Sequence, residues 1–118
     1  MKKVIICVSF LVFLASASMV YAHPPSDIQI TFDAKTRMLS ALMVHNTSNP
    51  LSHYINKVDI GLNGSEIIEH LISRQDDNVG QTVSYFIPDV KDGDVLSVEG
   101  YCNISGKLKK EIKAEIKN

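Results

Sequence analysis

Three histidines and one cysteine are the residues of this chain that could together hold a metal ion. His23 begins a His-Pro-Pro segment, and His45 and His53 lie at the two ends of a polar stretch. Cys102 begins the segment at residues 102–106, near the end of the chain. Imidazole nitrogen and thiolate sulfur both suit iron, copper and zinc, and the residue types alone do not choose among these metals. We therefore predict a nitrogen/sulfur metal site made by these four side chains.

The N-terminal residues have the pattern of an export signal. Two lysines form a basic start, residues 4–15 form an apolar core, and residues 20–22 fit a cleavage site. We predict cleavage after Ala22, which makes His23 the first residue of the mature chain; a cut after Ala17 is the alternative. The mature protein is then expected in the periplasm or outside the cell.

The remaining residues, 23–118, are expected to form one domain. Without the two signal lysines, 10 of the 12 lysines and arginines face 13 acidic residues, a net charge of −3. No basic stripe indicates a nucleic-acid partner. No stretch after the signal approaches the roughly 20 apolar residues of a membrane helix. Cys102 would be the sole cysteine left, so an internal disulfide is excluded, and the oligomeric state stays open.

Apolar and polar residues alternate along most of the mature chain, which is the pattern of half-buried strands. Residues 66–73 also fit a helical turn, but strands flank them on both sides and we predict a strand. The final lysine- and glutamate-rich run has a period of two, so it too is predicted as a strand. The strands are predicted at residues 28–32, 38–45, 54–62, 66–73, 82–87, 95–102 and 108–116. Seven short strands with regular spacing predict an all-β, antiparallel sandwich of immunoglobulin type.

The histidine and cysteine segments, taken in order, resemble the iron domain of superoxide reductases, the family of the neelaredoxins and desulfoferrodoxins. The family's motifs are His-x-Pro, a His-Pro before His-Tyr-Ile, and Cys-Asn-x-His-Gly; their counterparts here begin at His23, His45, His53 and Cys102. The resemblance implies a mononuclear, non-haem iron held by equatorial histidines and one axial thiolate. His23, His45 and His53 would then be equatorial ligands and Cys102 the axial one. It also implies reduction of superoxide to hydrogen peroxide, with an outside electron donor of unknown identity.

This chain departs from the family pattern at several positions. Ser105 stands where the family has its fourth histidine, and Asn46 stands where a proline follows the second. Tyr21 and Ala22 occupy the positions of a glutamate-lysine pair whose lysine draws in the superoxide anion in active members. Three nitrogens and one sulfur also fit four-coordinate zinc. Two alternatives therefore stay open: a non-catalytic copper or zinc module, and a purely structural immunoglobulin-like module without metal.

Cleavage after Ala22 would add one further ligand to the predicted site. His23 would carry a free α-amine with a pKa of about 7.7–8.0. That amine and the imidazole of the same residue could chelate one ion and replace the missing histidine. Taken singly, the same residues also have ordinary explanations: Cys102 could be a small buried apolar residue, and His70 matches no motif of the family.

Overall fold

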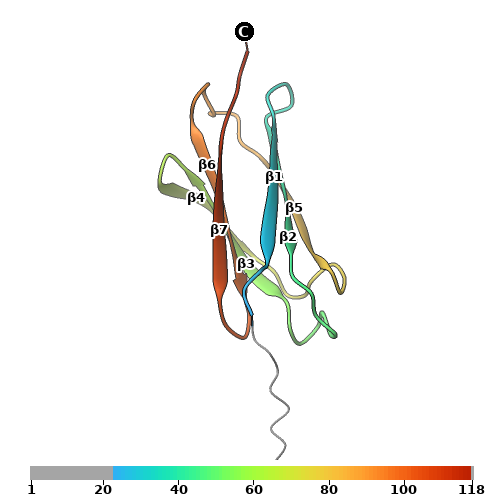
Figure 1. Ribbon diagram of the computed structural model, residues 1–118. Helices are drawn as coiled ribbons and strands as arrows, with labels where there is room; N and C mark the ends of the chain where they lie inside the picture. Colours follow the sequence, from blue (N-terminus) through green and yellow to red (C-terminus); the bar gives the residue numbers. More distant parts are fainter. Residues whose placement is uncertain (1–22, 118) are drawn as a thin grey trace, which may run out of the picture.

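The computed structural model describes residues 23–117, which form two antiparallel β-sheets packed face to face (Figure 1). The predicted signal peptide, residues 1–22, lies outside the described residues. One sheet has the strand order β1-β2-β5 and the other has the order β4-β3-β6-β7. The strands are β1 (Asp27–Asp33), β2 (Met38–Val44), β3 (Ile55–Leu62), β4 (Ser65–Leu71), β5 (Gly80–Phe86), β6 (Val95–Cys102) and β7 (Lys107–Lys113). Nowhere in residues 23–117 is there a helix long and apolar enough to cross a membrane.

The predicted immunoglobulin-like sandwich of seven strands is confirmed. In a constant-type immunoglobulin domain the fourth strand joins the sheet of the first, second and fifth strands. Here β4 instead pairs with β3, in the opposite sheet. The reason is the two-residue turn at Asn63 and Gly64, with φ angles of 51° and 85°, which closes β3 and β4 into a tight hairpin. The turn leaves no length of chain with which β4 could cross to the other sheet.

The core lies between the two sheets and is built from the apolar positions of the alternating pattern. Full burial of such a side chain contributes about 1.5–3 kcal/mol relative to its exposure, so the alternation itself selects which face of each strand turns inward. The fully enclosed core side chains include Leu39, Met43, Ile55, Val58, Ile60, Leu96 and Val98.

The segment that fits either a helical turn or a strand, residues 66–73, contains strand β4, as predicted. Ile68 and His70 turn inward and are half-buried, while Ile67 and Leu71 are exposed, which is a period of two. Nδ1 of His70 lies 2.8 Å from the hydroxyl of Tyr85 on β5, so this contact joins the two sheets. Burial raises the pKa of Tyr85 to about 12, which keeps its hydroxyl protonated and able to donate to His70. His70 therefore has a structural contact between the sheets.

The last strand is shorter than predicted. It was expected to run to Ile116, but β7 ends at Lys113. Beyond that residue the chain bonds the turn before β6: the N–H of Ala114 donates to the carbonyl of Asp94 at 2.7 Å, and the N–H of Gly93 donates to the carbonyl of Ala114 at 2.9 Å. Ala114 still points inward and is buried. The predicted alternation of inward and outward side chains therefore holds at Ala114, and only its backbone hydrogen-bond partners differ from those of a strand in the sheet.

Candidate metal centre

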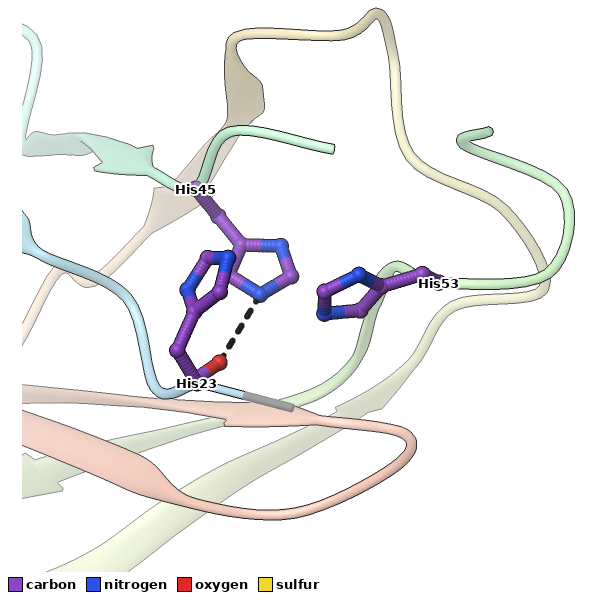
Figure 2. Close-up of side chains that lie close together, drawn as sticks. All are labelled: His23, His45 and His53. Carbon is purple, nitrogen blue, oxygen red and sulfur yellow. Dashed lines mark hydrogen bonds between the residues drawn. The ribbon is translucent and has the colours of Figure 1, made fainter. Parts of the chain in front are cut away.

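His23, His45 and His53 meet at one end of the sandwich, where their rings face one another (Figure 2). His23 lies just before β1, His45 directly follows β2, and His53 lies two residues before β3. One ring nitrogen from each can be chosen so that all three lie within 4.8 Å of one another. The ring centroids are 4.7 Å apart for His23 and His45, 5.1 Å for His23 and His53, and 4.7 Å for His45 and His53. We call these three residues the histidine group.

His45 is the fully buried member of the group and is held on both sides of its ring. Its Nδ1 lies 2.8 Å from Oε1 of Gln75, and its Nε2 lies 3.0 Å from the carbonyl oxygen of His23 (dashed line in Figure 2). Its backbone N–H donates to the carbonyl of Val79 at 2.8 Å, which fixes the chain where it leaves β2. The ring therefore has a defined orientation, with Nε2 turned toward the other two histidines.

Nε2 of His53 is a buried ring nitrogen that lacks a hydrogen-bond partner among the described residues. The side chain is 8% exposed, and its Nε2 is buried without any hydrogen-bond partner in the described structure. Burial lowers the pKa of His53, and repulsion by a charge on His45, and then on His23, lowers it further. A buried polar atom left unpaired costs roughly 1–3 kcal/mol. A metal ion would bind this lone pair, so the unpaired nitrogen fits a metal ligand.

His23 is positioned by the segment that follows it. Its Nε2 lies 3.0 Å from the carbonyl of Asn46, and Pro24 packs on Gly106 in the hairpin between β6 and β7. A Cβ atom at Gly106 would come within 2.9 Å of the Pro24 ring, and the φ angle of +90° there also favours glycine. The glycine of the Cys-Asn-x-x-Gly segment thus makes room for the chain that carries the first histidine.

Cys102, the fourth predicted ligand, is buried and free but is not a member of the histidine group. Its sulfur and the three imidazole nitrogens do not all lie within 4.8 Å of one another. It ends β6 opposite Ile55, in the strand that begins two residues after His53. Its role as a ligand stays a prediction. Ser105, at the family's fourth histidine position, is exposed.

Asn103, next to Cys102, fixes the chain on both sides of His53. Its Oδ1 accepts from the N–H of Tyr54 at 2.8 Å, and its Nδ2 donates to the carbonyl of Ser52 at 3.0 Å. The asparagine of the cysteine segment therefore has a structural function that does not depend on metal. It ties the third histidine to the end of β6.

Gln75 was not predicted as part of the site. It is 2% exposed and contacts the ring of His45, yet in the sequence it is one polar residue in a polar loop. No spacing or motif distinguishes it from its neighbours.

A second group, Asp59, Glu66 and Glu69, brings carboxylate oxygens within 4.8 Å of one another, but the two glutamates are exposed. The two glutamates are solvated, and Oδ2 of Asp59 lies 3.6 Å from Nζ of Lys57, so we assign no metal to this group.

The histidine group can act as a set of nitrogen donors for a transition metal, with no carboxylate among its members. No family model matches this chain, and neither a curated protein nor a solved structure matches it. Metal binding is therefore inferred from the three imidazoles and their surroundings.

Substitution of Gly106 tests whether the His23 segment is seated as described. Gly106→Ala and Gly64→Ala both place a side chain at a positive φ, which costs about 1–2 kcal/mol at each site. Only at Gly106 would the new Cβ meet Pro24, whereas nothing lies within 4 Å at Gly64. We expect Gly106→Ala to lower the free energy of unfolding by about 1–3 kcal/mol more than Gly64→Ala, measured by urea denaturation. Equal losses would show that Pro24 does not pack on this glycine.

The lowered pKa of His53 predicts a loss of stability in mild acid when metal is absent. In the unfolded chain the imidazole takes up a proton near pH 6.5, while the folded protein keeps it neutral to a lower pH. The unfolded state thus binds more protons in this interval. As the pH is lowered through it, the free energy of unfolding falls by up to about 1.4 kcal/mol per pH unit. His53→Leu should flatten this slope in urea titrations with a chelator present. A slope unchanged by the substitution would contradict the assignment.

Proposed function

We propose that this protein binds one transition-metal ion through His23, His45 and His53. The observation that carries the proposal is the buried, unpaired Nε2 of His53 within a group of three imidazoles. Neutral imidazole is the commonest metal ligand in proteins. No acidic side chain is part of this group in the described residues. A bound metal cation would therefore supply the partner that Nε2 of His53 lacks in the described structure.

Iron is the metal we propose, because of the resemblance to superoxide reductases. Three imidazoles suit iron, zinc, copper and nickel, so the donor set by itself does not decide. Three protein ligands leave room at the metal for a small molecule, as in catalytic metal sites. When bound, ferrous iron would supply one electron to superoxide, which with two protons gives hydrogen peroxide, and an outside donor would restore the ferrous state.

The chain's own residues would hold this site in three ways. The hydrogen-bonded ring of His45 fixes one donor, and the clamp by Asn103 fixes the segment of His53. The half-buried His23 brings the third donor on the segment that enters β1. The main chain of His23 also lies within the group, since its carbonyl oxygen is 3.0 Å from Nε2 of His45. If His23 is the first residue of the mature chain, its free α-amine would therefore lie on a residue whose ring and main chain are both part of the site.

Cys102 is the part of the proposal on which catalysis depends. The resemblance implies that Cys102 would be a thiolate ligand, which would donate electron density to bound iron. For this role its sulfur has to join the histidine group when the metal binds. A copper or zinc protein without redox turnover is the second candidate, and the observation that favours it is that three imidazoles meet without the sulfur.

Metal binding is tested by removing one histidine at a time. His53→Ala should weaken binding of Fe²⁺ or Zn²⁺ by more than the roughly 10–100-fold that loss of an outer-shell contact costs. His70→Ala is the matched control, because His70 lies outside the group and contacts Tyr85. We expect wild type and His70→Ala each to bind one ion per chain by calorimetry. Equal affinity in all three proteins, or no binding by wild type, would refute the site.

The role of Cys102 is tested by absorption spectroscopy of the iron-loaded, oxidised protein. A thiolate bound to ferric iron should give a visible charge-transfer band that is lost in Cys102→Ser. The zinc-loaded wild type is the control, since Zn²⁺ has no redox chemistry and a filled d shell. A colourless iron-loaded protein would mean that Cys102 is not a ligand. In that case, failure of the reduced iron form to consume superoxide in pulse radiolysis would leave the non-catalytic metal protein.

A further inference from the structure

We propose that Gln75 is a positioning residue of the metal site, which selects the tautomer of His45 and turns its Nε2 toward the other histidines. This inference rests on the proposed function, because it describes how the chain prepares one ligand for the ion. Gln75 lies in the loop between β4 and β5 and is 2% exposed. Its amide is the sole side-chain group of the described residues that is hydrogen-bonded to the ring of His45.

The surroundings of Gln75 fix which way its amide points. Nε2 donates to the carbonyl of His45 at 2.7 Å and to the carbonyl of Asp77 at 2.9 Å. Both partners are acceptors, so the amide nitrogen has to be on that side. Oε1 accepts from the N–H of Ile55 at 3.2 Å, which places the oxygen on the other side. The group that faces Nδ1 of His45 is therefore an acceptor.

This orientation favours one tautomer of His45. Because Oε1 can only accept, Nδ1 has to carry the proton in their 2.8 Å contact. A neutral imidazole has one N–H and can donate to only one of the two acceptors beside its ring, Oε1 of Gln75 at 2.8 Å or the carbonyl oxygen of His23 at 3.0 Å. Donation to Gln75, the shorter contact, leaves the lone pair on Nε2. Nε2 is the atom that faces His23, within the histidine group (Figure 2). Metal-bound histidines commonly donate their second N–H to an outer-shell acceptor in this way, and the contact fixes the orientation of the ring.

Gln75 also joins the chain segments that carry two of the three histidines. Its amide bonds the carbonyl of His45, at the end of β2, and the N–H of Ile55, at the start of β3. Its backbone N–H donates to the carbonyl of Pro50, in the loop that leads to His53. With all four hydrogen-bonding positions of the amide used, any substitution leaves at least one buried partner unpaired.

Two substitutions separate positioning from a purely structural role. Gln75→Leu removes the acceptor, whereas Gln75→Glu keeps an oxygen toward His45 and loses both donated bonds. Gln81→Leu is the control, because Gln81 is another buried amide of the same region that bonds Asp76 and Thr82 instead of a histidine. The readouts are the His45 tautomer in the metal-free protein, from ring ¹⁵N shifts at about pH 8, where free imidazole is neutral, and the affinity for Zn²⁺.

We expect the Nδ1–H tautomer in wild type, Gln75→Glu and Gln81→Leu, and its loss in Gln75→Leu together with a roughly 10–100-fold weaker affinity. An unchanged tautomer and affinity in Gln75→Leu would overturn the inference. So would an Nε2–H tautomer in wild type, a result that stands even where Gln75→Leu does not fold. Failure of wild type to bind Zn²⁺ or Fe²⁺ would refute the proposed function, while the tautomers would still test the orienting role of Gln75.

Discussion

Three imidazole rings packed within 4.7–5.1 Å of one another impose the constraint on which the rest of this end of the molecule depends. Imidazoles so close repel one another when charged, and each needs partners for its nitrogens. A different contact of the chain holds each histidine in place. Gln75 orients His45, Asn103 fixes the segment of His53, and Gly106 leaves room for Pro24, which follows His23. Nε2 of His53 is left over, and it is the atom that a metal ion would satisfy.

Most of the fold could be predicted from the sequence because burial on one face of a strand leaves a period of two. This signal identified the other strands, whereas residues 66–73, whose apolar pattern also fits a helical turn, were predicted as a strand because strands flank them. It does not report which strands pair. The end of β7 and the sheet that β4 joins depend on backbone bonds to the turn before β6 and on a two-residue hairpin. The histidines could be predicted as candidate ligands, since few side chains bind metal. The role of Gln75 could not be predicted, because it depends on a contact with His45 that only the folded chain creates.

The resemblance to superoxide reductases and the geometry agree on the histidines and differ over the sulfur. Motif order placed His23, His45 and His53 together, and the structure brings them together. Cys102 was assigned to the same ion, but its sulfur is not a member of the group. Asn103 and Gly106, its neighbours in the motif, are accounted for by packing and by hydrogen bonds to the backbone. The cysteine segment thus supports the site mechanically, whether or not its thiolate binds the metal. Metal binding by the three histidines therefore does not depend on whether Cys102 supports catalysis.

The central claim is that three imidazoles of this chain bind one ion. X-ray absorption at the metal edge of the loaded protein tests it most directly, because imidazole rings give a distinctive pattern of scattering from their outer carbon and nitrogen atoms. We predict about three imidazoles per metal ion, with or without a sulfur. A shell of oxygen atoms without imidazole scattering would contradict the claim, and the histidine group would then have only a structural role.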